Sequence, residues 1–265
     1  MNFNHENLMV YQRILSFNIK VANWVAGWDG KHAIRDQLSR AAESMLENVA
    51  MASAAYSSKK QRSLDYAIGS GLECAACLDL ASIKRLLDAK TVYVEKEELS
   101  QVLRMLVGLR KSWAQSTRGV RENDADYSVG GGEFNKAHDK IRNKEEEAHP
   151  LFHHETLDVY KTSIEAATAF YTVEAVFQLS NQLFRRLDEL FTSMVLNIAE
   201  GNGRFSHADQ IRFMGISHES AIKLAARLDL CAAQNLLPKD KVDECKALLK
   251  RVSAMTLAII SGDCR

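Results

Sequence analysis

The sequence is built from one pattern used twice. Seven apolar residues within 34–49 have apolar counterparts 149 positions later, within 183–198. Residues 78–80 and 228–230 both read Leu-Asp-Leu, at an offset of 150. A tandem duplication limits the choice of folds more than any other feature, because the same pattern must fold in both halves.

Each copy predicts four amphipathic helices. Apolar residues recur at steps of three and four, which places them along one face of a helix. Only two prolines interrupt the chain, as suits a helical protein. We expect helices over 4–26, 32–55, 57–87 and 95–113 in the first copy, and over 151–178, 180–201, 206–236 and 239–261 in the second.

Four such helices with short connections favour an antiparallel bundle, since this arrangement buries four apolar faces at once. The chain is therefore predicted to be all-α, with two tandem up-and-down four-helix bundles at 1–117 and 150–265. Residues 118–149 contain three consecutive glycines and a long polar run. They predict a flexible polar linker between the bundles.

Turn residues predict how the helices end. Gly201 and Gly203 supply permissive backbone after the second helix of the second copy, and Ser206 can cap the next helix. The spacing of apolar residues predicts a tighter third connection in the second copy, where 237–242 spans 5 positions and 87–99 spans 12. The copies are thus expected to differ at this connection.

Charge and cysteine content exclude several classes of protein. Basic and acidic residues number 34 each, so the chain lacks the excess of a dedicated nucleic-acid binder, and only a local patch or an oligomer could concentrate such charge. The first 116 residues carry 15 basic and 12 acidic side chains. Five irregularly spaced cysteines argue against a secreted disulfide framework, and no signal peptide or apolar run of membrane length is recognisable. We expect a cytoplasmic protein with no membrane partner and no cofactor.

The stretch 197–204, Asn-Ile-Ala-Glu-Gly-Asn-Gly-Arg, closes the second helix of the second copy. With the Gln-Leu-x-Arg-Ala-Ala-x-Ser pattern at 37–44, it resembles the signature of the four-helix bundle protein family, also called the 23S rRNA intervening-sequence protein family. The resemblance covers both copies but not the linker. The first copy departs from the signature, since residues 51–52 are Met-Ala where residues 200–201 are Glu-Gly.

This resemblance implies a binding or scaffold role more than an enzyme. Members of the family form up-and-down four-helix bundles, typically assembled into pentameric rings. Its best-understood relatives resemble the accessory variability determinant of diversity-generating retroelements, which partners a reverse transcriptase and binds nucleic acid through a basic surface. We therefore expect a non-enzymatic homo-oligomeric scaffold that binds RNA or DNA, with a reverse transcriptase as a candidate partner.

The motif positions have specific predicted roles. The amides of the two motif asparagines could bond across helices and fix their register, or lie at a boundary and face water. The motif glutamate could pair with an arginine, and the first copy lacks it. The motif residues are Asn48, Asn197, Glu200, Gly201, Gly203 and Arg204.

Cations at one helix start are the main candidates for nucleic-acid contact. Residues 59–62 begin the third helix, where backbone N–H groups and positive charge both favour phosphate. Further cations lie toward the other end of that helix and in the family signature. A solvated charged face is the alternative explanation. The predicted nucleic-acid-binding residues are Lys59, Lys60, Arg62, Lys84, Arg85 and Arg204.

The alternative function is RNA cleavage. Arg212 and His218 superficially resemble the Arg-x4–6-His motif of HEPN ribonucleases, which are also helical bundles. At this spacing the two side chains fall on different faces of a regular helix, and the first copy has no counterpart. We therefore predict no catalytic residues.

Two groups of potential metal ligands are incomplete. Cys74 and Cys77 form a CxxC inside a predicted helix, but zinc usually needs a second pair of ligands, so we expect core residues. His149, His153 and His154 cluster where the second copy begins. His149 and His153 could share a helix face only if Pro150 began a helix there. No metal site is therefore predicted.

The copies differ in side-chain size at one core position. Residues 41–42 are Ala-Ala, whereas residues 190–191 are Leu-Phe. We expect the first copy to pack its second helix closer to a neighbour, or to fill the space with Trp24 or Trp28.

Two bundles in one chain cannot fill the five places of one ring with whole chains. Three arrangements remain: a pseudo-dimer within the chain, two stacked rings built by five chains, or a ring of one copy with the other outside. Because the copies have diverged, we expect a five-chain assembly in which they have separate roles. A mass near 150 kDa in light scattering would support it, and one near 30 kDa would leave the pseudo-dimer.

Overall fold

The computed structural model describes residues 3–115 and 150–262, apart from residue 56. Within these residues it contains eight α-helices, three short 3-10 helices and no β-strand. The all-α prediction is confirmed for the described part of the chain. The predicted linker at 118–149 lies outside it.

Each copy provides four α-helices. The first copy contains η1 (Asn4–Asn7), α1 (Met9–Ala26), α2 (Ala33–Ala54), α3 (Ser57–Ile83) and α4 (Ala89–Gln115). The second contains η2 (His153–Thr156), α5 (Asp158–Tyr171), η3 (Glu174–Gln178), α6 (Asn181–Asn202), α7 (His207–Ala233) and α8 (Lys239–Ser261).

The first helix of each copy is shorter than predicted. A 3-10 turn precedes α1, and Leu8 between them is extended, with φ −84° and ψ 121°. Leu157 is extended in the same way before α5, with φ −73° and ψ 131°. An extended residue cannot continue the hydrogen bonds of an α-helix. The predicted single helices over 4–26 and 151–178 are therefore wrong at these positions.

The third connection has the same length in both copies, contrary to the prediction. Five residues separate α3 from α4 and α7 from α8. Arg85 and Asn235, which are 150 positions apart, both have left-handed backbone, with φ 56° and 57°. The next residue in each turn donates its N–H to a carbonyl of the last helical turn. These bonds join Leu86 to Ala81 at 2.8 Å and Leu236 to Cys231 at 2.9 Å. The prediction failed because α4 begins at Ala89, ten residues before Leu99, the first residue of the apolar stripe on which the prediction was based.

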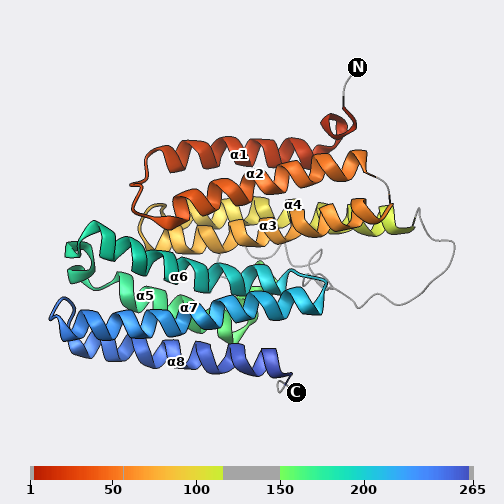
Figure 1. Ribbon diagram of the computed structural model, residues 1–265. Helices are drawn as coiled ribbons and strands as arrows, with labels where there is room; N and C mark the ends of the chain where they lie inside the picture. The colour runs from red at the N-terminus through yellow and green to blue at the C-terminus, as the bar shows by residue number, and fades with distance from the viewer. Residues whose placement is uncertain (1–2, 56, 116–149, 263–265) are drawn as a thin grey trace, which may run out of the picture.

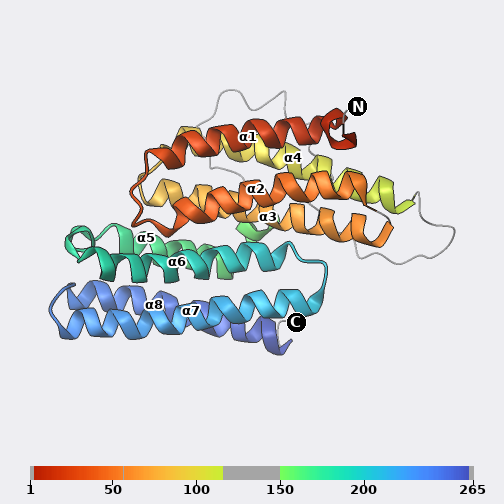
Figure 2. The same ribbon diagram turned by 45° about the horizontal axis from the view of Figure 1, so that its top comes forward.

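The two bundles lie side by side, with their helices running along a common direction (Figures 1 and 2). Helix α3 packs against α2 and α4 of its own copy, and against α5 and α6 of the other. We call this contact of α2 and α3 with α5 and α6 the seam. Buried apolar side chains of both copies form one continuous core.

Helix α3 owes its composition to this central place. Residues Lys59–Ile83 are long and apolar enough to cross a membrane by length and composition alone, which the sequence analysis did not expect. In the structure, 72% of the most apolar window in this stretch is buried inside the protein. Packing on both sides within the protein therefore accounts for its apolar character.

The first helix compensates for the size difference at the second. Ala42 of α2 and its counterpart Phe191 of α6 are both fully buried. Residues 17–18 of α1 are Phe-Asn, where residues 166–167 of α5 are Ala-Ala. The Asn18 amide also donates to the Ala42 carbonyl at 3.0 Å. The larger side chains thus lie on α6 in the second copy and on α1 in the first, at residues that the prediction did not name.

Phe191 provides a test of this core. It stacks on Phe170, with ring centroids 4.6 Å apart, and no part of it reaches solvent. Phe191→Ala should lower the free energy of unfolding by about 3–5 kcal/mol, measured by urea denaturation. The control Phe177→Ala removes an aromatic ring that is 49% exposed, and should cost much less. A loss below about 1 kcal/mol for Phe191→Ala would contradict the core assignment.

Candidate nucleic-acid interface

The family signature of the second copy lies in the seam. A Cβ atom on Gly203 would overlap the Leu72 side chain, and Gly69 Cα is 3.6 Å from that position. Gly203 has φ −84°, which any residue adopts, and Gly201 lies inside α6. The prediction that these glycines supply permissive backbone is therefore wrong. They allow the end of α6 to approach its neighbours closely.

Arg204 follows Gly203 and is enclosed by both copies. Its side chain is 10% exposed and pairs with the Glu200 carboxylate, the partner that the first copy lacks. Its guanidinium lies 5.0 Å from the ring centroid of Tyr66 in α3 and 4.9 Å from that of Phe213 in α7. The structure therefore places Arg204 inside the seam, and not on the surface where a nucleic acid would reach it.

Cations and aromatic rings alternate around this end of the seam. Arg62 donates to the Tyr66 hydroxyl from Nε at 3.1 Å and from Nη2 at 3.0 Å. Arg110 lies 3.9 Å above the Phe205 ring, and its Nε donates to Asp65 at 2.5 Å. Other pairs are Lys60 with Trp113 and Arg212 with Phe213. We call this set the seam cluster: Lys59, Lys60, Arg62, Tyr66, Arg110, Trp113, Arg204, Phe205, Arg212 and Phe213.

The seam cluster brings together four of the six predicted residues, including the enclosed Arg204, with others that the sequence analysis missed. Lys59, Lys60 and Arg62 belong to it as neighbours on α3, and Lys59 and Arg62 are exposed. Arg110 and Phe205 were missed because they meet across the two copies. The position of Phe205 directly after the signature is the one local signal that could have indicated it.

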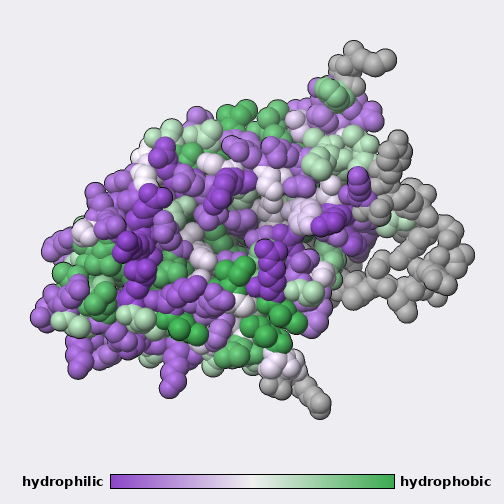
Figure 3. Space-filling view, in the orientation of Figure 1, coloured by the Kyte–Doolittle hydropathy of each residue, from purple (hydrophilic) through white to green (hydrophobic). Residues whose placement is uncertain are grey.

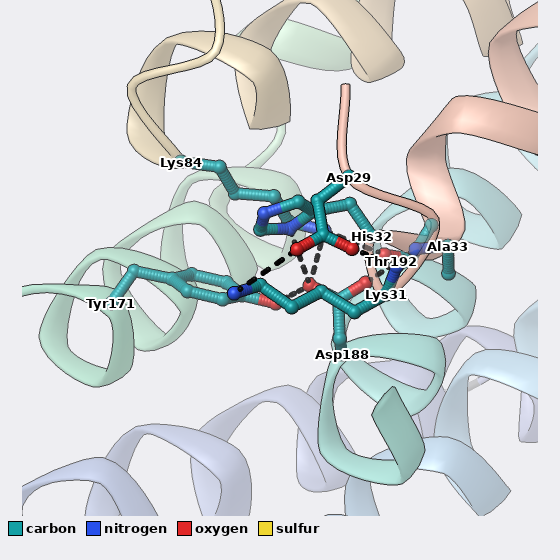
Figure 4. Close-up of polar contacts among 8 residues, drawn as sticks. All are labelled: Asp29, Lys31, His32, Ala33, Lys84, Tyr171, Asp188 and Thr192. Atoms are coloured by element: carbon teal, nitrogen blue, oxygen red, sulfur yellow. Dashed lines mark hydrogen bonds and ion pairs between the residues drawn. The ribbon is translucent and has the colours of Figure 1, made fainter. Parts of the chain in front are cut away.

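Lys84 has a different role from the predicted one. Its Nζ lies 2.8 Å from the Asp188 carboxylate, and both side chains are 0% exposed (Figure 4). It also donates to Thr192 at 3.0 Å, while the Tyr171 hydroxyl and the Ala33 N–H each donate to Asp188 at 2.7 Å. Burial raises the pKa of Asp188, but the ammonium and the side-chain hydrogen bonds from His32, Lys84 and Tyr171 outweigh it and lower the value to about 2. The prediction that Lys84 binds nucleic acid is wrong, because it joins the two copies internally.

Arg85 is exposed but lies away from the seam cluster. It occupies the turn after α3, whereas Arg62 lies near the start of that helix. At 1.5 Å per residue the separation is roughly 35 Å. The predicted six-residue set therefore does not form one surface.

The two motif asparagines behave alike and bond within their own helices. Asn48 donates to the Ser44 carbonyl at 2.8 Å, and Asn197 to the Ser193 carbonyl at 2.7 Å. The hydroxyl of each of these serines contacts a serine hydroxyl of the following helix. The distance is 2.9 Å to Ser70 in the first copy and 3.0 Å to Ser220 in the second. The predicted cross-helix bond is thus made by the serine hydroxyls, and the asparagine amides support them.

Arg212 and His218 do not converge. His218 is partly buried, with Nδ1 3.2 Å from the Ser253 carbonyl oxygen of α8. Arg212 is exposed and lies 5.7 Å from the ring centroid of Phe213. One side chain faces the bundle interior and the other faces solvent, as expected for their spacing on a regular helix.

One group of potential metal ligands occurs in the described part of the chain. Ligand atoms of Asp79, His154 and Glu155 lie within 4.8 Å of one another. Lys96 pairs with both carboxylates, so an ammonium already supplies positive charge there. Burial opposes that charge, but the two carboxylates raise the pKa of Lys96 overall. The arrangement therefore fits an ionic contact between the copies better than a metal centre.

The other potential ligands are dispersed. His153 is exposed and contacts Asn202 at 3.2 Å, whereas His154 is fully buried. Residue 149 lies outside the described residues. Cys74 and Cys77 are free thiols in the core, as predicted.

Glu73 of α3 is a partly buried acid near the signature. Burial raises its pKa to about 7, and the Glu200 carboxylate contributes in the same direction. Arg40 and Arg204 oppose this shift without cancelling it. Folding therefore favours the protonated form of Glu73.

The stability of the protein should consequently depend on pH. The unfolded chain ionises Glu73 near its ordinary pKa of 4.5, so its contribution to the free energy of unfolding should decrease as pH rises from about 4.5 to about 7, by at most roughly 3 kcal/mol. Glu73→Gln should be more stable than the wild type at pH 8 and nearly equal at pH 4, measured by thermal unfolding. The exposed-site control Glu43→Gln should keep the wild-type pH dependence. If Glu73→Gln also keeps it, another group is responsible.

Comparison with known proteins agrees with this geometry. A family model described as the 23S rRNA-intervening sequence protein matches residues 6–108 and again residues 155–258. One match falls on each bundle, and neither covers the linker. No curated protein and no solved structure matches the chain. Because the two matches together cover well over half of the sequence, the chain belongs to the 23S rRNA-intervening sequence protein family and contains two tandem copies of its domain.

Proposed function

We propose that this protein is a non-enzymatic helical scaffold that binds nucleic acid through the exposed residues of the seam cluster. The observation that carries the proposal is the alternation of cations and aromatic rings across both copies. Tyr66 and Arg62 come from the first copy, whereas Phe205 and Arg212 come from the second. A binding surface of this kind requires both bundles to be present and packed together.

The seam cluster combines two features that single-stranded nucleic acids require. Exposed cations such as Lys59, Arg62 and Arg212 can neutralise phosphates. Aromatic rings offer faces on which bases stack, with little dependence on sequence. Phe205 is 38% exposed and Tyr66 is 36% exposed, so part of each residue is open to a ligand. Two other arginines of the cluster are each paired with a carboxylate, so these exposed cations would carry the attraction to phosphate in a chain whose formal net charge is zero.

The protein partner is a separate part of the proposal. A reverse transcriptase as partner is supported by the family resemblance, and an assembly with such an enzyme is compatible with a scaffold that holds RNA or DNA. Co-purification of the two proteins with and without nucleic acid would test it. The competing function, RNA cleavage by Arg212 and His218, would require these separated side chains to act together.

Nucleic-acid binding can be measured directly. The wild type should bind labelled single-stranded RNA or DNA longer than about 16 nucleotides, with fluorescence anisotropy as the readout. Lys59→Ala combined with Arg62→Ala should weaken binding and reduce the slope of log K against log salt by roughly 0.7 per lost phosphate contact. No binding by the wild type at low salt would overturn the proposal.

A matched control separates the seam cluster from general charge. Lys161 and Lys239 are exposed cations of the second copy outside this cluster, so replacing both with alanine removes the same charge. Their loss should leave affinity and salt dependence nearly unchanged. If both double variants weakened nucleic-acid binding equally, the attraction would be non-specific. If the wild type shortens the RNA and His218→Ala does not, the result would favour RNA cleavage as the function instead.

A further inference from the structure

The second copy is anchored to the first by the turn that precedes α5. Phe152 is 4% exposed and lies beside Leu72 of α3 and Ser100 and Leu103 of α4. These residues form a groove in which only about 10 Å³ remains free. An aromatic plug from one copy thus fills a groove between the third and fourth helices of the other.

An ionic cluster completes this contact. Lys96 pairs with Asp79 of its own copy, and its Nζ lies 2.7 Å from the Glu155 carboxylate of the second copy. The Tyr160 hydroxyl donates to Asp79 at 2.7 Å. The second copy therefore contributes the carboxylate of Glu155 and the hydroxyl of Tyr160. The first copy contributes the carboxylate of Asp79 and the ammonium of Lys96.

The first copy carries the same plug, but uncovered. Four residues of the second copy have counterparts of the same type 149 positions earlier. Phe152, His154, Glu155 and Tyr160 correspond to Phe3, His5, Glu6 and Tyr11. The ring spacings also match: 5.5 Å for Phe3–His5 against 5.7 Å, and 4.5 Å for His5–Tyr11 against 4.6 Å. Phe3 is nevertheless 71% exposed. The N-terminal plug, as we call these four residues, is formed without a groove to occupy.

The second copy carries the matching groove, and it is open. Ile222, Lys250 and Ser253 correspond, at an offset of 150, to the residues beside Phe152, and they line a groove of about 400 Å³ between α7 and α8. Ile222 is 52% exposed, whereas its counterpart in the first copy is 3% exposed. The ionic pair is kept as Lys246 with Asp229. Figure 3 shows hydrophobic surface over α7 and α8 on the face in view.

We propose that a second copy of this chain occupies the groove with its N-terminal plug. Phe3 would enter beside Ile222, while Glu6 and Tyr11 would meet Lys246 and Asp229, as their counterparts do within the chain. The plug and the groove lie on different bundles, so the contact is head-to-tail. Such contacts close into a ring or continue as an open assembly.

This association is weaker than the contact within the chain. The internal ion pair of Lys84 and Asp188 has no equivalent, because Gln234 and Ser39 occupy the corresponding positions. The groove is also more polar, since Ser253 replaces a leucine. The assembly should therefore depend on protein concentration, whereas the packing of the two copies within a chain does not.

The oligomeric state of the full chain tests the proposal. Sedimentation or light scattering should give a mass that rises with concentration above the 29.7 kDa of one chain. Phe3→Asp and Ile222→Asp should each hold the mass at one chain. Both side chains are mostly exposed, so the fold should remain, as circular dichroism can check. The control Phe177→Asp, also at an exposed aromatic, should associate like the wild type.

Mixing the two variants distinguishes head-to-tail from symmetric pairing. Phe3→Asp retains an intact groove, and Ile222→Asp retains an intact plug. The mixture should therefore form a two-chain complex and nothing larger. A wild type that stays monomeric, association that survives in both variants, or a mixture that stays monomeric would each overturn the proposal. The assay contains no nucleic acid, so its outcome is independent of the proposed function.

Discussion

The arrangement of the two copies depends on one buried ion pair. Lys84 and Asp188 come from different bundles and neither reaches solvent. Removing two charges from water is costly, and their attraction offsets that cost only when the geometry is good and the remaining hydrogen-bonding groups are satisfied. Tyr171, Thr192 and the Ala33 N–H meet that requirement. Any slip of one bundle against the other would leave a buried charge unpaired, so the pair fixes a single arrangement.

The divergence of the copies follows from this seam. Only the second copy needs Gly203 and the Glu200–Arg204 pair, because only its α6 end packs against α3 of its partner bundle. Among the described residues of one chain, no other bundle covers the corresponding end of α2, and Met51 there is 59% exposed. The loss of the signature in the first copy is thus a consequence of position. Each copy keeps the residues that its own neighbours require.

The sequence was sufficient to predict the elements but not the seam. Periodic apolar residues predicted each bundle helix, and the duplication predicted that both bundles share one fold. Lys84 was interpreted as a surface charge because a lone lysine near a helix end carries no local sign of burial, and its partner is 104 residues away. Arg110 and Phe205 were missed for the same reason, since their pairing depends on how the bundles meet. The extended Leu8 and Leu157 were missed because apolar periodicity does not report backbone conformation at a single residue.

The seam makes the two bundles one cooperative unit, and urea unfolding followed with two optical probes tests this coupling. All three tryptophans, Trp24, Trp28 and Trp113, belong to the first copy, so tryptophan fluorescence reports on that copy alone. Circular dichroism at 222 nm reports on the helices of both. If the seam couples the copies, both probes should give one coincident urea transition. Separate midpoints, or a circular dichroism transition in two steps, would contradict the account.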